Sequence, residues 1–163
     1  MDFQVKLDGV WYSLDTINQQ ATVINSQDRD YEGDIVIPSS LLYEGVIYNV
    51  LKIGDFAFSN CVNLGSISFP SSLQCIGAYA FSACSKINSL TFPKEMKSVM
   101  QFAFEECSGL LDIYCPTENV SSASNAFEGN DLSVVTLHVL EDTKEKYKKT
   151  EPWCRFGNIV PLL

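Results

Sequence analysis

The side chains with the most reactive chemistry are six cysteines and a single histidine, His138. Cys61, Cys84 and Cys107 recur at an interval of 23 residues, and the other three cysteines are Cys75, Cys115 and Cys154. Zinc sites typically use short Cys-x-x-Cys spacings, and the chain has no such pair, so we expect no metal site. The periodic cysteines instead predict a buried column of small apolar thiols that bond to turn carbonyls. We expect most of the six thiols to be free.

Nucleophilic catalysis would need a base beside a thiol or hydroxyl, and His138 is the one histidine available. No local motif supports a pair of His138 with Cys154 or with a serine. The chain also lacks a glycine-rich phosphate loop and a Gly-Lys-Ser/Thr motif. We therefore expect no enzyme activity, no catalytic residue and no cofactor.

An acidic run from Asp28 to Asp34 imitates part of a calcium-binding loop, because acidic residues and a glycine occupy its positions 1, 3, 5 and 6. The twelfth position is Ser39 where such loops have a bidentate glutamate, and Pro38 excludes a helix after the loop. Calcium binding is one interpretation of this run. The favoured interpretation is a solvated acidic turn that leads into a strand.

These residues belong to an internal repeat of 23 residues. The repeat is clearest in four phenylalanines, each preceded by alanine, and in three prolines: Phe58, Phe81, Phe104, Phe127, Pro70, Pro93 and Pro116. A fixed period of this length is typical of stacked repeat proteins.

Each repeat has two halves. The half that ends in proline alternates apolar and polar residues, as at Ile67 and Phe69, which predicts a short strand with one buried face. The other half spaces apolar residues three to four apart, which predicts one helical or 3₁₀ turn that packs Ala, Phe and Cys inward. A single unit buries too little apolar surface to fold alone, so the units must stack. We predict an α/β, β-rich solenoid with short parallel strands on one face and turns on the other.

The ends of the chain depart from the repeat. We predict a single domain, 1–163, in which 1–52 forms an N-terminal β cap and first rung, 53–139 forms the repeats and 140–163 forms a C-terminal cap. Asp8-Gly9 predicts a type I′ hairpin turn, and a second hairpin is expected near Glu44-Gly45. The last strand is expected over 134–139. Asp142 and Glu145 resemble an acidic capping box that opens a short helix.

The net charge of −9 and the sequence pI near 4.4 argue against binding to nucleic acid or to anionic membranes, which need a basic surface. No apolar run approaches the roughly 20 residues of a membrane span. The first residues carry no export signal, so the protein stays inside the cell or its signal was trimmed.

The repeat Ile-Gly-x-x-Ala-Phe-x-x-Cys-x-x-Leu-x-x-Ile-x-Phe-Pro resembles the BspA-like (Treponema pallidum type) leucine-rich repeat. The segments Asp8–Tyr12, Tyr31–Pro38 and Tyr147–Ile159 are similar to the flanking caps of that family. The resemblance implies a right-handed leucine-rich-repeat superhelix in a secreted or surface protein of host-associated microbes. It also implies adhesion to host proteins or to other cells.

The remaining functional surface is the outward face of the strands. Its residues alternate with the buried positions: Ser66, Ser68, Ser89, Thr91, Asp112, Tyr114, Val134 and Thr136. Repeat proteins use such extended faces to bind partners, and tyrosine is frequent at binding hot spots. The alternative is a polar sheet face that only keeps the protein soluble.

Three functions remain open. The first is a non-enzymatic, monomeric module that binds a protein, is exported or displayed at the cell surface, and inserts into no membrane. The second is a structural spacer within a larger surface protein. The third is glycan binding, which has weak support because few aromatic residues are expected to be exposed.

Overall fold

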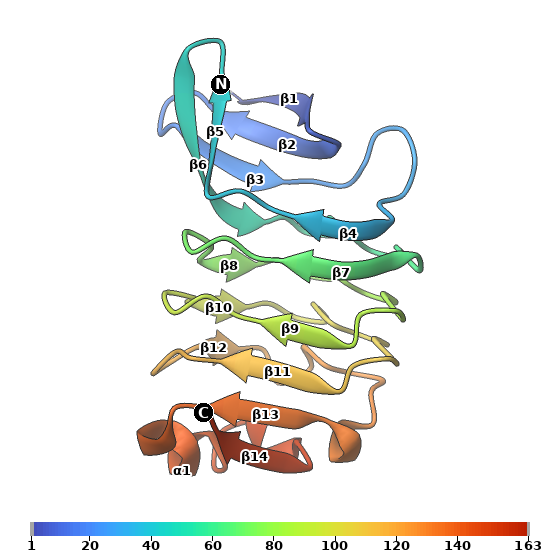
Figure 1. Cartoon of the computed structure of the whole chain (residues 1–163), viewed down its shortest axis with the longest axis vertical. Coiled ribbons are helices and arrows are strands. Elements are labelled where there is room, and N and C mark those ends of the chain that lie inside the picture. Colours follow the sequence, from blue (N-terminus) through green and yellow to red (C-terminus); the bar gives the residue numbers. More distant parts are fainter. Residues whose placement is uncertain (1, 163) are drawn as a thin grey trace.

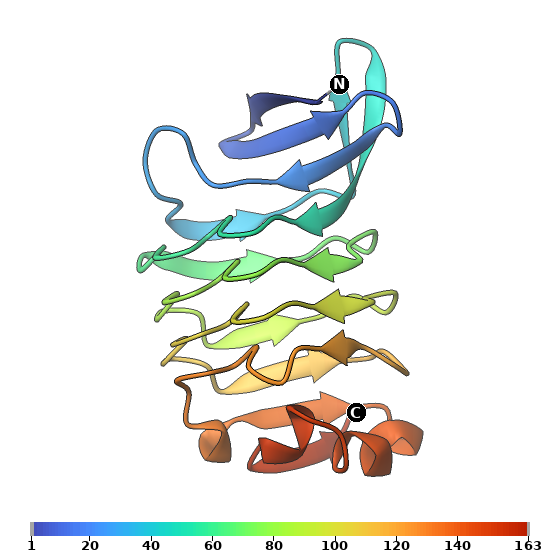
Figure 2. The same cartoon turned by 180° about the vertical axis from the view of Figure 1, so that it is seen from behind.

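In the computed structural model, which describes residues 2–162, the repeats form successive rungs of an elongated stack (Figure 1). Met1 and Leu163 lie outside the described part. Each central rung has one short strand in a front column and another in a back column. The front column comprises β4 (Gly33–Val36), β7 (Leu64–Ser68), β9 (Ser89–Thr91), β11 (Asp112–Cys115), β13 (Thr136–Val139) and β14 (Asn158–Pro161). The back column, seen from behind in Figure 2, comprises β6 (Val46–Ile53), β8 (Cys75–Ile76), β10 (Ser98–Val99) and β12 (Ser121–Ser122).

Parallel pairing joins the rungs in both columns. In the front column, β4 pairs with β7, and β9, β11, β13 and β14 form a separate four-stranded sheet. In the back column, β6, β8, β10 and β12 pair in order and continue a larger sheet that holds the N-terminal strands. The register Asp34–Ser66 and Ile35–Ile67 confirms that the segment before Pro38 is an earlier rung.

The N-terminal region adds β-hairpins to the back column. Its strands are β1 (Asp2–Leu7), β2 (Val10–Asp15), β3 (Gln20–Val23) and β5 (Ser40–Tyr43). Asp8 and Gly9 between β1 and β2 both have positive φ, 48° and 82°, which confirms the predicted type I′ turn. Glu44 and Gly45, with φ of 48° and 80°, form the predicted turn between β5 and β6.

The prediction of helical or 3₁₀ turns on one face of each rung is wrong. The segment after each back-column strand is a series of β-turns, closed in one rung by bonds from the amide of Ala57 to Gly54 O and from that of Cys61 to Phe58 O. Phe56 and Asn60 have φ of 61°, outside the helical region. Linked β-turns and a helical turn both bring residues three apart together, so apolar spacing could not distinguish them. The two-residue strands before these turns were also missed, and strands therefore occupy two faces.

A stack of phenylalanine rings runs through the centre of the core. Phe58, Phe81, Phe104 and Phe127 are buried, with successive ring centroids 5.0, 5.3 and 5.3 Å apart and planes within 11° of parallel. This column confirms that the repeats fill one common interior. Trp153 closes it at the C-terminal end, where it contacts Phe127 edge-on at 5.6 Å.

The strands of the C-terminal region differ from their prediction in two respects. The strand predicted over 134–139 is shorter, because Val134 belongs to the 3₁₀ helix η1 (Leu132–Val134) before β13. A further strand, β14, pairs in parallel with β13, so β13 is not the last strand. The other elements here are η2 (Glu141–Thr143), α1 (Lys144–Tyr147) and η3 (Trp153–Arg155).

The predicted acidic capping box is absent from the C-terminal helix. Asp142 lies inside η2, and neither η2 nor α1 has a side-chain hydrogen bond at its N-cap. The 3₁₀ turn begins one residue before Asp142, so this carboxylate is already within helical structure. Thr143 instead donates its hydroxyl to the Leu140 carbonyl at 2.8 Å.

Candidate binding surface

Parallel pairing arranges the outward side chains of β9, β11 and β13 in two rows that cross the strands. Asp112 is in register with Ser89 on one side and Thr136 on the other. Tyr114 is in register with Thr91 and His138. The side chains between these rows, such as Leu90 and Ile113, point into the core. The structure therefore brings together five of the eight predicted surface residues, and we call this set, with His138, the sheet surface.

The centre of the sheet surface is a cluster of Asp112, Tyr114 and His138. The His138 ring stacks on Tyr114 with centroids 4.2 Å apart and planes 14° apart. His138 Nε2 lies 2.8 Å from Asp112 Oδ1. The side chain of His138 is 20% exposed and that of Asp112 is 39% exposed, so the cluster is held in place and is open to a partner.

His138 was missed as a surface residue, although the strand expected over 134–139 contains it. β14 pairs with this strand, so His138 does not lie at the edge of the sheet. The alternation on which the prediction depended already contains the signal, since His138 follows Thr136 by two residues and must share its face. Val134 was predicted as an outward residue of the last strand, but it lies in η1, outside β13.

Ser66 and Ser68 are exposed, but they belong to the other front sheet. Ser66 Oγ donates to Asp34 Oδ1 at 2.8 Å, and Ser68 is in register with Val36, which is 72% exposed. Figure 1 shows β7 directly above β9 in the front column. The two serines thus extend the surface toward the N-terminal end without joining the ladder of β9 to β14.

The periodic cysteines have the predicted structural role. Cys84 Sγ lies 3.0 Å from the Phe58 carbonyl, and Cys107 Sγ lies 3.1 Å from the Phe81 carbonyl, each one rung away. Burial raises the pKa of the Cys107 thiol to about 12 and raises that of Cys84 well above its usual range. All six cysteines have free thiols. A neutral buried thiol is a poor nucleophile, so this column serves packing.

Cys115, Cys154 and His138 have separate surroundings. Cys115 is buried beside Thr117 Oγ1 at 3.1 Å and Tyr147 Oη at 3.5 Å. Cys154 is exposed in η3. The structure pairs His138 with Asp112 and Tyr114, and gives it no contact with Cys154 within residues 2–162.

The carboxylates of the acidic run turn toward separate partners. Asp28 accepts bonds from Lys6 Nζ at 2.6 Å and from Ser26 Oγ at 2.7 Å, and these bonds hold the pKa of its carboxyl well below the usual range. Asp34 bonds to Ser66 in the next rung. Within residues 2–162, no three His, Cys, Asp or Glu side chains are grouped to hold a metal ion.

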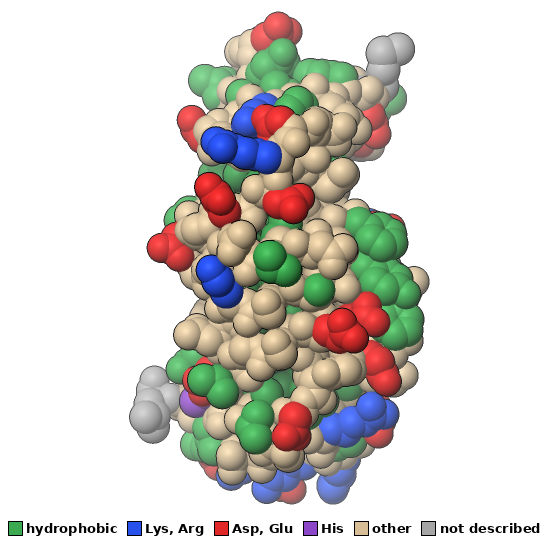
Figure 3. All heavy atoms as spheres, turned by 90° about the vertical axis from the view of Figure 1, so that its right-hand side faces the viewer, with side chains coloured by type: hydrophobic (Ala, Val, Ile, Leu, Met, Phe, Trp, Pro, Cys, Tyr) green, Lys and Arg blue, Asp and Glu red, His purple; other side chains and the backbone are tan. Residues whose placement is uncertain are grey.

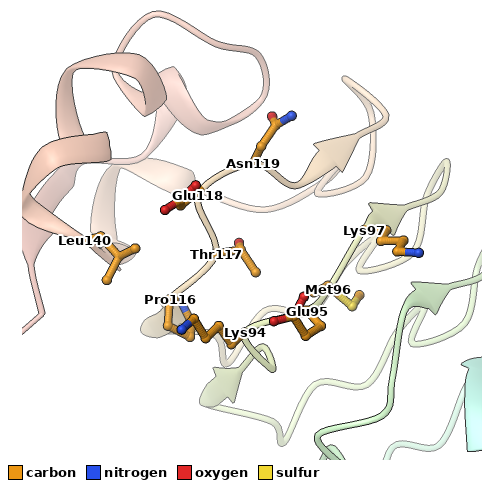
Figure 4. Close-up of a pocket in the computed structure, with 9 residues that line it drawn as sticks. All are labelled: Lys94, Glu95, Met96, Lys97, Pro116, Thr117, Glu118, Asn119 and Leu140. Carbon is orange, nitrogen blue, oxygen red and sulfur yellow. The ribbon is translucent and has the colours of Figure 1, made fainter.

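A groove of about 730 Å³ separates the loops that follow β9 and β11 (Figure 4). Lys94, Glu95 and Lys97 line it from one loop and Glu118 from the other, so its charge is mixed. Lys146 Nζ fixes the second loop, with bonds to Glu118 O at 3.1 Å and Asn119 Oδ1 at 3.0 Å. Charges of both signs at an open groove give it no preference for one class of ligand.

Comparisons with known proteins identify the repeat. A family model described as the BspA type leucine rich repeat region matches residues 39–147 in six copies. A search of curated proteins found no match. The described residues 2–162 contain no helix with the length and apolar content to cross a membrane.

Solved structures share the fold at low sequence identity. A leucine-rich repeat protein from Bacteroides capillosus is 21% identical, with a TM-score of 0.71 over 83% of this chain and 97% of that chain. The Treponema pallidum leucine-rich repeat protein is 19% identical, with a TM-score of 0.64 over 98% and 83%. A leucine-rich cell surface protein from Faecalibacterium prausnitzii is 20% identical, with a TM-score of 0.60 over 98% and 54%.

Proposed function

Because the chain belongs to the BspA-type leucine-rich repeat family, we propose that it is a non-enzymatic module that binds a protein partner through its sheet surface. The observation that carries the proposal is the cluster of Tyr114, His138 and Asp112 at the centre of that surface. Leucine-rich repeats in general present extended sheet faces to partners.

The chemistry of the cluster suits a protein interface. Stacking on His138 and the bond between His138 and Asp112 hold the rings before binding, so little side-chain entropy is lost when a partner docks. Tyrosine combines a large apolar ring with a hydroxyl, which makes it frequent at hot spots. The small polar residues Ser89, Thr91 and Thr136 around the cluster let a partner approach closely.

The proposal includes the wider architecture and the setting. The rungs form a right-handed leucine-rich-repeat superhelix, with 1–52 as an N-terminal β cap, 53–139 as repeats and 140–163 as a C-terminal cap. The monomeric protein acts outside the cell or at its surface, in adhesion to host or cell-surface proteins. The fold shared with the Faecalibacterium prausnitzii cell surface protein supports this setting.

A structural spacer within a larger surface protein is the second candidate. It is favoured by the small hydroxyl side chains of Ser66, Ser68, Ser89 and Thr91, which would keep a sheet face soluble without any ligand. Under this alternative the sheet surface has no partner, and substitutions there alter solubility only.

An array of purified extracellular-matrix and cell-surface proteins, with a glycan array beside it, tests the proposal. The isolated chain should capture at least one protein, and Tyr114→Ala and Asp112→Ala should each weaken capture at least tenfold. Asp142→Ala, an exposed acidic change outside the sheets, should leave it unchanged. Capture that survives both sheet-surface variants would refute the assignment of the surface, and no capture at all would favour the spacer.

A further inference from the structure

A second set of aromatic rings forms a ladder on the turn side of the stack. Phe56, Tyr79 and Phe102 are spaced 23 residues apart, one in each central rung. Their centroids are 5.0 Å apart in both steps, with planes 3° and 20° from parallel. Figure 3 shows a column of hydrophobic side chains along the right-hand margin of this side, with acidic side chains below it. Phe56 is the exposed ring of this ladder, and Tyr79 and Phe102 are half-buried.

The backbone does not explain why these positions are aromatic. Phe56, Tyr79 and Phe102 have φ of 61°, 55° and 57°, a left-handed conformation that glycine or asparagine adopts at lower cost. Phe56 is also more than half exposed as a residue, at 53%. Stacking accounts for the middle ring, but Phe56 at the end of the ladder has a neighbouring ring on one side only.

A hollow of about 330 Å³ lies beside Phe56. Its walls come from the loop 25–31 of the preceding rung and from the turn 55–61. Tyr79, which covers one face of the Phe56 ring, belongs to the following rung. The hollow therefore lies on the side of Phe56 opposite Tyr79, and no other aromatic ring within residues 2–162 stacks there.

The polar residues that line the hollow carry no positive charge. Asp30 and Asp55 are acidic, Asn25 and Asn60 are amides, and Ser26, Ser59 and Tyr31 have hydroxyls. Asp55 Oδ1 accepts the amide of Ala78 at 2.9 Å, so this carboxylate is directed toward the following rung, on the Tyr79 side of Phe56. Asp30 makes no hydrogen bond or ion pair with the described residues 2–162.

Basic groups of the same region are directed elsewhere or lie outside the hollow. Lys6 is paired with Asp28, 2.6 Å away, and no lysine or arginine lines the cavity. The hollow thus combines the ring of Phe56 with the carboxylate of Asp30, and Arg29 of the same loop is exposed and outside its lining. The protein as a whole carries a net charge of −9, which favours approach of a basic partner.

We propose that this hollow binds an arginine side chain from a basic segment of a partner protein. The guanidinium stacks on the open face of Phe56, and its N–H groups donate to Asp30. Arginine suits the site better than lysine because its planar cation stacks on aromatic rings and donates several hydrogen bonds in one plane. Sugars suit the ladder less well, because the stacked rings cover each other's faces and leave mainly edges exposed.

The acidic side chains at the other end of the ladder also favour a basic segment of a partner. Glu105, held by Ser82 Oγ at 3.1 Å, and Glu106 follow Phe102 in the chain. They lie two rungs from Phe56, and each ring-stacking step spans 5.0 Å. About three residues of extended chain cover that distance, so a short segment with two basic residues could reach both ends.

Titration of the folded chain with fluorescein-labelled hexa-arginine, followed by anisotropy and by ¹H–¹⁵N spectra, tests the inference. Amide shifts should concentrate at Phe56, Ala57 and Asn60. Phe56→Ala and Asp30→Asn should each weaken binding about three- to tenfold, in the range of an exposed cation–aromatic contact. Asp30→Asn leaves the ring stack intact, so its effect cannot arise from unfolding of the ladder.

The controls separate this site from general charge attraction and from the sheet surface. Asp142→Asn removes one exposed carboxylate elsewhere and should leave the affinity within about twofold. Tyr114→Ala should leave it unchanged, so failure of the sheet-surface proposal would not affect this result. Hexa-lysine should bind at least threefold more weakly than hexa-arginine. Equal affinity for both peptides, or shifts spread away from the hollow, would overturn the inference.

Discussion

The imidazole of His138 lies flat against the phenol ring of Tyr114, with centroids 4.2 Å apart, across the parallel pair of β13 and β11. The two residues are 24 positions apart in the chain, and the parallel register makes them direct neighbours. The same register brings Asp112 within 2.8 Å of the imidazole. One repeat step therefore brings these three side chains of the sheet surface into contact.

This stack should be measurable as a coupling energy. Tyr114→Ala, His138→Ala and the double variant should give a favourable interaction of about 0.5–1.5 kcal/mol in urea unfolding, the range of stacked aromatic pairs. Tyr114→Ala combined with Ser66→Ala should be additive, because Ser66 lies in another sheet. A zero coupling between Tyr114 and His138 would contradict the stacked arrangement.

The central phenylalanine stack should dominate stability. Phe81 is fully buried between Phe58 and Phe104. Phe81→Ala should lower the free energy of unfolding by about 3–5 kcal/mol, because it removes a large ring and leaves a cavity. Val62→Ala, at a side chain that is 50% exposed, should change it by no more than about 0.5 kcal/mol. Similar losses for both variants in chemical denaturation would contradict the shared core.

The left-handed turn positions offer a stabilising substitution. Ala83 has φ of 61°, where a Cβ is unfavourable. Ala83→Gly should raise the free energy of unfolding by about 0.5–1 kcal/mol, since relief of the left-handed strain exceeds the entropy cost of glycine. Ala78→Gly, in the same rung with ordinary φ, should lower it. Thermal melts of the two variants should shift in opposite directions, and a shift of both to lower temperature would count against the turn assignment.

The buried thiols predict a loss of stability in alkali. Burial raises the pKa of Cys107 to about 12, whereas an unfolded cysteine ionises near pH 8.5. The unfolded state therefore binds fewer protons above pH 8.5, and the contribution of Cys107 to stability falls as pH rises toward its folded pKa. Between pH 8.5 and 10 this thiol alone should account for a loss of about 1–2 kcal/mol.

Serine variants isolate that effect, because a hydroxyl does not titrate in this pH range. Cys107→Ser should flatten the pH dependence of the free energy of unfolding between pH 8.5 and 10. Val62→Ala, which alters no titratable group, should leave that pH dependence unchanged. An identical slope in wild type and Cys107→Ser would show that the buried thiol does not contribute.

The surfaces differ in how far they could be predicted. Six outward positions on β7, β9 and β11 follow from simple alternation, and Thr136 follows the same rule in β13. His138 could have been found by extending that rule by one step. The hollow beside Phe56 could not, because the loop 25–31 that forms one wall lies outside the repeat. Its approach to the turn 55–61 depends on how the long N-terminal connection folds back.

The amino-acid sequence alone was sufficient for the period, the family resemblance, the phenylalanine column and the hairpin turns. Each of these depends on residue type at a fixed spacing, and stacking converts such spacing directly into neighbours. Only the tertiary structure decided that the turns are β-turns with residues in the left-handed conformation, that strands occupy two columns, and that β14 follows β13. These features depend on backbone dihedrals and on hydrogen bonds between rungs, and an apolar pattern is compatible with several arrangements of both.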